Sequence, residues 1–277
     1  MNKNKALKTL IGMIVSFALF VALFVWTFDP FYLYHEPFFG MQATLYDHDH
    51  QVAGSLRNLS YDRVFIGSSM VENFDPDYLD AKDGLTSIKA IKPSGRTADF
   101  IYYLNMIHDH QDVKEIYWGL DIYGLITPPE TTLYDNGVPR YLHTKTILDD
   151  IPYLFNKDII FKKIPTMIGY SLTGAYTGGK SYHWYEDKEF SASAAMRFYN
   201  KPATASAPLD VETEKRYVEQ NTQLILQEVM AHPEIEYNLF YTPYSMLWWD
   251  NGYTGGLGEA YLYAMEASIP VLVECDN

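Results

Sequence analysis

The stretch VFIGSSMVENFDP, residues 64–76, decides the fold class of this chain. It begins with three apolar residues and turns at Gly67-Ser68-Ser69, which is typical of a short buried strand that runs into a loop. Working outward, further short apolar runs predict strands at 87–91, 113–120, 237–241 and 271–274. Segments with apolar residues at helical spacing lie between them, at 97–107, 211–230 and 259–267. This alternation predicts an α/β fold, a parallel sheet covered by helices on both faces.

The composition is that of a folded protein and excludes several classes of function. The 277 residues are 48% hydrophobic and 16% aromatic, which is too apolar for a disordered chain and enough for a real core. A net charge of −14 leaves no basic surface to neutralise phosphates, so we expect no nucleic-acid partner. The single cysteine, Cys275, excludes a disulfide-stapled scaffold and a cysteine-based metal cluster.

An apolar segment near the N-terminus predicts a membrane-spanning helix. Residues 9–28 (TLIGMIVSFALFVALFVWTF) contain no charged side chain, and about 20 such residues cross a hydrocarbon core of about 30 Å. Basic residues precede the segment, at Lys3, Lys5 and Lys8. The positive-inside rule then places the N-terminus in the cytoplasm and the main domain outside the cell membrane. A cleaved signal peptide is the alternative, but its apolar core is only about 7–15 residues long, and no small-x-small motif follows Val25.

These elements suggest a domain organisation. We expect a cytoplasmic tip at 1–8, a transmembrane signal anchor at 9–28, a membrane-proximal connector at 29–60 and an extracellular domain at 61–277. Within that domain the strand–helix alternation is interrupted at about 130–205 by Pro, Gly and many tyrosines, with one helix expected at 146–162. We interpret this interruption as an insertion or a lid beside the sheet.

Three of the predicted strands end in residues suited to acyl chemistry. The strands are followed by Gly67-Ser68-Ser69-Met70, by Ser94-Gly95-Arg96-Thr97 and by Gly119-Leu120-Asp121. Because ligands bind at the carboxyl ends of parallel strands, we expect all three motifs on one rim of the sheet. A serine at such a turn can present its hydroxyl outward, and backbone N–H groups nearby can hold an oxyanion. Each motif taken alone is also typical of a turn or a helix cap.

Taken together, VFIGSSMVENFDP, KPSGRTADF and IYWGLD resemble the first three sequence blocks of the SGNH/GDSL hydrolase family. The closer similarity is to its membrane-anchored bacterial branch, which includes proteins similar to the D-alanine-transfer protein of teichoic acid synthesis. The resemblance implies a flavodoxin-like three-layer fold with Ser69 as the nucleophile. It also implies that the N–H groups of Ser69 and Gly95 bind the oxyanion, and that no metal or organic cofactor is needed.

The sequence departs from that family at two places. The third block is usually Gly-x-Asn-Asp, whereas Asp121 stands at the asparagine position, and a carboxylate repels an oxyanion unless it is protonated. We therefore expect Asp121 to orient a neighbouring group or the substrate. The family's general base is a histidine in an Asp-x-x-His motif after the last strand, but only Cys275, Asp276 and Asn277 follow the predicted strand at 271–274.

Two explanations remain for the missing histidine. Either the natural chain continues into a segment that supplies Asp-x-x-His, or this domain has lost catalysis. A parallel strand so close to Asn277 lacks the helix that should cover it, which favours an incomplete chain. The base would then come from outside this sequence, and we expect the 277 residues alone to be inactive.

Other histidines offer alternative sites. Asp47-His48-Asp49-His50 alternates carboxylates with imidazoles, which suits a divalent cation but is more typical of a polar surface loop. His108-Asp109-His110, at the end of a predicted helix, is interpreted in the same way. His232, which precedes Pro233, is expected to be a solvated loop residue.

Aromatic residues after the fourth predicted strand are candidate substrate contacts. Tyr244, Trp248 and Trp249 lie near the expected rim, and sugar faces stack on such rings, although most tyrosines simply pack with a wet hydroxyl end. We therefore expect a membrane-bound serine esterase or acyltransferase that acts on acyl groups of a cell-envelope glycan through a Ser69 acyl-enzyme. The alternative is a non-catalytic, membrane-anchored envelope assembly or glycan-binding protein that uses the same rim.

Overall fold

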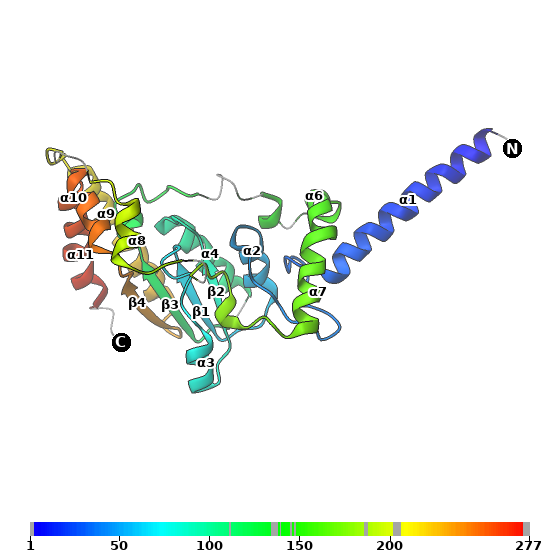
Figure 1. The fold of residues 1–277 in the computed structure, drawn as a ribbon, viewed down its shortest axis with the longest axis horizontal. Coiled ribbons are helices and arrows are strands. Elements are labelled where there is room, and N and C mark those ends of the chain that lie inside the picture. The colour runs from blue at the N-terminus through cyan, green and yellow to red at the C-terminus, as the bar shows by residue number, and fades with distance from the viewer. Residues whose placement is uncertain are drawn as a thin grey trace.

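The structure is a computed structural model that describes residues 3–110, 112–133, 138, 140–144, 146, 148–185, 188–201 and 206–273. Four parallel strands form one sheet in the order β2-β1-β3-β4 (Figure 1). They are β1 (Arg63–Gly67), β2 (Ser87–Ile91), β3 (Glu115–Leu120) and β4 (Glu236–Tyr241). The predicted α/β fold with a parallel sheet is confirmed, and these four strands lie where the apolar runs placed them.

Helices occupy much of the remaining described chain. They are α1 (Lys3–Phe28), α2 (His48–Asn58), α3 (Asp77–Asp83), α4 (Thr97–His110), α5 (Ile122–Leu125), α6 (Ile151–Leu154), α7 (Ile164–Thr173), α8 (Ala192–Phe198), α9 (Glu212–Ala231), α10 (Met246–Thr254) and α11 (Gly258–Val273), with short 3₁₀ or π turns η1 (Arg140–His143), η2 (Ile159–Lys163) and η3 (Gly178–Lys180). The helices α2, α4, α9 and α11 pack in succession, each against the next. This row covers one face of the sheet, where Trp118 of β3 meets Phe100 of α4 at a centroid distance of 6.4 Å.

The loop after β1 and helix α3 cover the opposite face of the sheet. Phe74, in this loop, stacks on Phe240 of β4 with ring centroids 5.4 Å apart. Helix α3 is tied to the start of β1 because the buried guanidinium of Arg63 pairs with Asp80 and Asp83. Strands covered on both sides can be apolar at every position, which explains why β1 reads as a continuous run rather than an alternating one.

The predicted fifth strand is wrong. Residues 271–273 belong to α11, which continues through Pro270 to Val273, and Glu274 lies outside the described residues. A short apolar run such as Val-Leu-Val does not distinguish a buried strand from part of a helix. Packing of α11 against α9 and α10 decides the conformation here.

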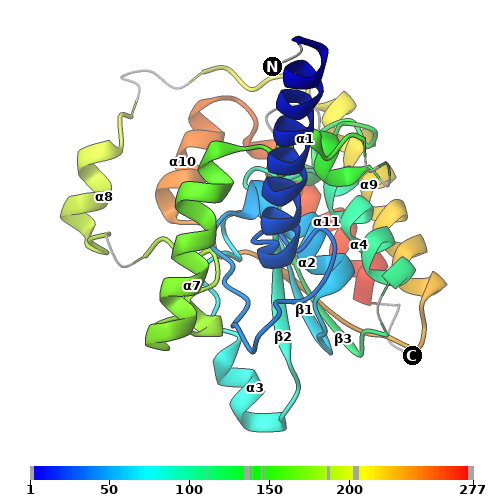
Figure 2. The ribbon, with the colours of Figure 1, turned by 90° about the vertical axis from the view of Figure 1, so that its right-hand side faces the viewer.

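The segments predicted as connector and insertion contain further elements. Within 29–60, α2 is buried at 51–56 and packs on α4 and β2, so it belongs to the core of the domain. The single helix expected at 146–162 is wrong: the short helix α6 and most of η2 lie in this range, and α7 begins after it, at Ile164, while residues 145 and 147 lie outside the described chain. Pro152 and Pro165 stand in the first turn of α6 and of α7, where a proline is tolerated and marks a helix start. Helix α8 stands apart from the helices that cover the sheet (Figure 2).

Helix α1 is long and apolar enough to cross a membrane, a property that it shares with signal sequences. It projects from the domain over most of its length (Figures 1 and 2). Its last turns pack on the domain, because Val25 belongs to a second buried apolar cluster, whose other members are Phe31, Leu142, Tyr153, Ile159 and Ile164. The chain leaves α1 at Asp29, whose buried carboxylate accepts the Tyr153 hydroxyl and the N–H groups of the next turn. Burial raises the pKa of Asp29 despite these hydrogen bonds.

Candidate active site at the carboxyl ends of the strands

Two glycines shape the rim at the carboxyl ends of the strands. Gly67 ends β1, Gly119 is the last residue but one of β3, and the side chain of Val71 lies against both. A Cβ atom would lie 2.5 Å from Val71 Cγ2 at Gly67 and 2.4 Å from it at Gly119. The lack of side chains at both positions therefore lets the loop after β1 fold back across the strand ends.

Two adjacent serines begin this loop, and their environments differ. Ser68 is buried, and its Oγ accepts the Met70 N–H at 3.3 Å. Ser69 is half-buried, and its carbonyl oxygen accepts the indole N–H of Trp184 at 3.4 Å. The N–H and hydroxyl of Ser69 have no hydrogen-bond partner among the residues that the structure describes. Ser69 is therefore the serine of the pair that is available to a substrate.

Gly95 lies on the same rim, but its backbone is engaged within its own turn. The Gly95 N–H donates to the carbonyl oxygen of Lys92 at 2.8 Å, and Ser94 before it has a left-handed φ of 55°. A Cβ atom at Gly95 would lie 2.5 Å from the ring of Phe100, so the close approach of α4 accounts for the glycine. In this arrangement the N–H expected to bind an oxyanion is already used.

Asp121 follows β3 and caps the short helix α5. One of its carboxylate oxygens accepts the Tyr123 N–H at 3.2 Å, and the other accepts the Tyr244 hydroxyl at 2.7 Å. Burial, together with the charge of Asp121, raises the pKa of Tyr244, so this hydroxyl stays a donor at neutral pH. Asp121 thus accepts hydrogen bonds from two neighbouring groups, and its role toward a substrate stays a prediction.

The aromatic residues predicted to contact a sugar pack on one another. Tyr244 and Tyr261 both lie nearly parallel to Trp248, with ring centroids 4.0 and 4.6 Å from it. Trp249 packs edge-on against Trp248 at 5.4 Å. Two tyrosine rings therefore stack on the Trp248 indole, and the hydroxyl of one of them, Tyr244, donates to Asp121. A sugar contact by these residues stays a prediction.

Sequence reasoning missed two buried titratable groups at the rim, Glu72 and Lys89. Glu72 lies three residues after Ser69, and burial raises the pKa of its carboxyl to about 7. Lys89 of β2 is fully buried and donates to the carbonyl oxygens of Glu72 and Ser181 at 2.7 and 2.6 Å. Its ammonium therefore meets backbone carbonyls rather than a carboxylate, and burial lowers its pKa to about 8. The one sequence feature that could have indicated this cluster is a lysine within the apolar run at 87–91.

Helix α2 brings a histidine to the same cluster. His48 Nε2 lies 3.9 Å from Glu72 Oε1, and its Nδ1 lies 3.2 Å from Asp49 Oδ1. Asp49 also pairs with Lys92, at the end of β2, at 3.3 Å. The sequence placed His48 in a surface loop because nothing in it shows that α2 packs on β2.

The other two residues of the 47–50 motif form a separate cluster of ion pairs. Asp47 lies 2.7 Å from His50 and 2.6 Å from Lys163. Although burial raises the pKa of Asp47, its hydrogen bonds to these two partners outweigh burial and lower the pKa to about 2. The four side chains of the motif are therefore divided between two ion-pair clusters.

Residues 181–184, within the segment interpreted as an insertion or lid, lie over the loop after β1. The Trp184 N–H donates to Asn73 Oδ1 at 3.0 Å, in addition to the indole hydrogen bond to Ser69. The ring of Tyr182, which is buried, lies 6.2 Å from that of His48. This short stretch therefore forms one wall of the rim.

A second set of chemically active side chains lies at the other end of the strands. His108 of α4, Glu228 of α9 and His232 just after α9 each offer one ligand atom, and these atoms lie within 4.8 Å of one another. The sequence treated both histidines as isolated helix-end or loop residues. It could not show that α4 packs against α9 and so brings them together.

A comparison of the chain with protein families, with curated proteins and with solved structures finds no match. The family is therefore not identified, and the α/β fold and the N-terminal apolar helix stand on the structure alone. The resemblance to SGNH hydrolases rests on three short motifs, of which the structure gathers Ser69, Gly95 and Asp121 on one rim.

Proposed function

We propose that the rim binds an acyl ester and that the Ser69 hydroxyl attacks its carbonyl carbon, with the Glu72–His48 pair as proton acceptor. The observation that carries this proposal is the loop after β1, in which an accessible serine stands three residues before a buried carboxyl group. Acyl groups of a cell-envelope glycan are the substrate class that the three motifs favour.

The reaction is an acyl transfer in two steps. In the first, Ser69 Oγ bonds to the acyl carbon, the serine proton passes to the Glu72–His48 pair, and the alcohol of the ester leaves with a proton. In the second, water or a sugar hydroxyl attacks the acyl-enzyme and releases Ser69. The N–H of Ser69, which has no partner in the described part of the chain, is one donor to the oxyanion, since the N–H of Gly95 is engaged elsewhere.

The protonation behaviour of Glu72 suits this role. A pKa of about 7 keeps both forms of the carboxyl populated near neutral pH, where general acid–base catalysis is most efficient. His48 Nε2 is 3.9 Å from the carboxylate, which is too long for a direct hydrogen bond, so the two side chains have to move closer to share the proton. The sequence led us to expect the base outside the chain, and these two side chains offer one within it.

We also propose that α1 is kept as an uncleaved signal anchor, with its N-terminus in the cytoplasm and the α/β domain outside the cell. Val25 of α1 is fully buried in the domain, and the carbonyl oxygen of Trp26 lies 2.7 Å from His35 Nε2. Cleavage after α1 would remove both contacts and expose the cluster around Tyr153. The three lysines before the apolar segment favour the stated orientation.

An activated ester tests the acyl-transfer proposal on the full chain in detergent micelles. With p-nitrophenyl acetate we expect a burst of p-nitrophenol and an acylation rate that rises as the pH rises through 7. Ser69→Ala should abolish the burst. Glu72→Gln should slow acylation about 100-fold and remove its pH dependence, because the base is lost. Ser193→Ala, an exposed serine of α8, and Glu219→Gln, a carboxyl of α9, are matched controls that should change neither.

The outcomes separate the two assignments. A burst lost in Ser69→Ala, with acylation in Glu72→Gln as fast and as pH-dependent as in the wild type, would retain the nucleophile and overturn the base. A burst unchanged in Ser69→Ala, or no burst in the wild-type chain, would contradict the proposed function.

A further inference from the structure

We infer that His108, Glu228 and His232 bind a divalent transition-metal cation, and that Zn²⁺ fits this ligand set best. His108 Nε2 lies 2.9 Å from Glu228 Oε1, and the ligand atoms of all three side chains lie within 4.8 Å of one another. Two imidazoles and one carboxylate are a recurrent zinc ligand set, with a fourth position left to water. The site lies at the amino ends of the strands, so it does not depend on the chemistry proposed at Ser69.

The local structure explains why these three side chains meet. Glu228 and His232 are four residues apart where α9 ends, so they lie on one side of its last turn. Helix α4 packs against α9, and His108 stands in the last turn of α4. The side chains of His108 and Glu228 are each 12% exposed, which shields them from bulk water while leaving a way in for an ion.

The two imidazole rings are already placed side by side. The rings of His108 and His232 lie face to face, with centroids 3.6 Å apart and 16° between their planes. This stacking brings a nitrogen of each ring within reach of the Glu228 carboxylate. Since nitrogen lone pairs lie in the ring planes, the two nearly parallel rings have to turn out of this stack before both nitrogens point at one ion.

A carboxylate orients His232, and a tyrosine hydroxyl contacts the nitrogen of His108 that faces Glu228. Glu234 Oε1 lies 3.3 Å from His232 Nδ1, and a proton held between them leaves Nε2 of His232 as the ligand nitrogen. The Tyr237 hydroxyl lies 3.4 Å from His108 Nε2. Glu228 and Glu234 together place two carboxylates at the cluster, and a divalent cation would balance their charge.

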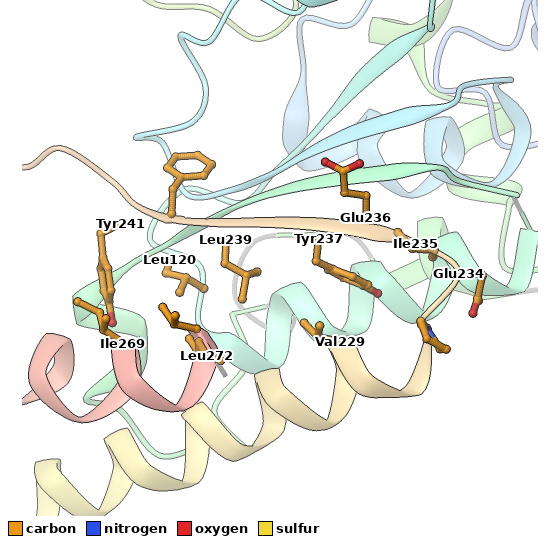
Figure 3. A pocket seen from close by; sticks show the side chains of 13 residues that line it. Leu120, Val229, Glu234, Ile235, Glu236, Tyr237, Leu239, Tyr241, Ile269 and Leu272 are labelled. Carbon is orange, nitrogen blue, oxygen red and sulfur yellow. The ribbon is translucent and has the colours of Figure 1, made fainter. Parts of the chain in front are cut away.

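A groove lies next to this cluster, lined by neighbours of the three proposed ligands rather than by the ligands themselves. The groove has a volume of about 610 Å³ and runs along β4, with Glu234 and Tyr237 in its lining. Figure 3 shows Glu234 at one end of the groove, Ile269 and Leu272 toward the other, and Tyr237 between them. A cation bound here would tie the ends of α4 and α9 to the start of β4, as a structural site.

Zinc binding to the full chain tests this inference, with protein purified without a polyhistidine tag and stripped with EDTA. We expect isothermal titration calorimetry with Zn²⁺ to show one ion per chain, and Co²⁺ at the same site to give visible d–d absorption bands. His108→Ala, His232→Ala and Glu228→Gln should each weaken zinc binding by about tenfold or more. Glu219→Gln, on the same helix but outside the cluster, is the matched control and should bind zinc like the wild type.

Circular dichroism of each variant shows whether it folds, and Glu228→Gln, which preserves side-chain shape, decides the matter if a histidine variant unfolds. Absence of saturable Zn²⁺ binding to the folded wild-type chain would overturn the inference. So would zinc binding that persists in the His108→Ala/His232→Ala double variant, because the ion would then sit elsewhere, for example at the 47–50 motif. Neither result depends on the reactivity of Ser69.

Discussion

The Glu72 side chain is only 10% exposed, and the buried ammonium of Lys89 does not contact its carboxylate. Lys89 Nζ donates to the backbone carbonyl of Glu72 instead of to its carboxylate. For both groups the effect of burial therefore outweighs the attraction between their opposite charges. Burial raises the pKa of Glu72 and lowers that of Lys89. Titratable groups shifted in this way concentrate at functional sites, which is why the pair bears on the function of the rim.

Replacing Glu72 with glutamine tests this burial through the pH dependence of stability. The pKa of Glu72 is about 7 in the folded chain and 4.5 in the unfolded chain. Its stabilising contribution to the free energy of unfolding is therefore fully present below pH 4.5 and is lost as the pH rises through 7. Glu72→Gln stays neutral and should be more stable than the wild type at pH 8 by about 3 kcal/mol, with little difference at pH 4.5. Urea unfolding at both pH values measures this. An equal stability difference at the two pH values would show that burial does not raise the pKa of Glu72.

Individual site residues were predictable from sequence only where a strand end fixes their position. Ser69, Gly95 and Asp121 follow parallel strands directly, so their shared rim follows from the fold. Glu72 and His48 reach the rim through a loop path and a helix packing that local sequence does not encode. The use of the Gly95 N–H inside its own turn is likewise a matter of geometry that the motif alone does not reveal.

At the scale of elements, the four strands were predictable because burial on both faces makes them uniformly apolar. The same criterion failed at 271–273, where apolar residues belong to α11 and pack on another helix. It also missed α2, whose buried stretch includes Gln51, Gly54 and Ser55 and therefore carries little hydrophobic pattern. A polar helix of this kind is recognised only by what it packs against.

The loop after β1 packs closely against β3, so adding a single methyl group at Gly119 should lower the free energy of unfolding. In Gly119→Ala the new Cβ would lie 2.4 Å from Val71 Cγ2 and 3.0 Å from Thr242 Cγ2, so we expect a loss of about 1–3 kcal/mol in the free energy of unfolding. Gly169→Ala, in α7, meets no atom within 4 Å and should instead be neutral or stabilising by up to about 1 kcal/mol.

Urea unfolding of both glycine variants, and of Gly119→Ala combined with Val71→Ala, measures these differences. The double variant should lose less stability than the sum of the two single variants, because the second change removes the clash. Equal stability of Gly119→Ala and the wild type would show that the loop does not lie across β3 as described.

At the scale of the whole molecule, three regions are separated along the chain and in space. The acyl-transfer rim lies at the carboxyl ends of the strands, the histidine–glutamate cluster at their amino ends, and α1 projects from one side (Figure 1). The apolar segment of α1 was predictable from its length and lack of charge alone. The burial of Val25 against residues from 142–164 was not, since that contact joins distant parts of the sequence.

The retained anchor is tested in cells that express the full chain. We expect the protein to keep its unprocessed mass and to remain in the membrane pellet after alkaline carbonate extraction. Introducing charges with Ile14→Arg and Leu19→Arg should reduce insertion, at a cost of about 3 kcal/mol each, whereas Ile14→Leu with Leu19→Ile should not. A mature protein that lacks α1 would contradict the anchor, and external protease that removes an N-terminal tag would contradict its orientation.

The acyl-transfer function is tested most directly by locating the acyl group on the protein. The full chain is mixed with p-nitrophenyl acetate, quenched in acid within the first turnover, digested, and mapped by tandem mass spectrometry. We predict an acetyl group on Ser69 in the wild-type chain and in Ser68→Ala, and none on this peptide in Ser69→Ala. An acetyl group on Ser68 alone, or acetylated surface lysines beside an unmodified Ser69, would contradict the assignment of Ser69 as the nucleophile.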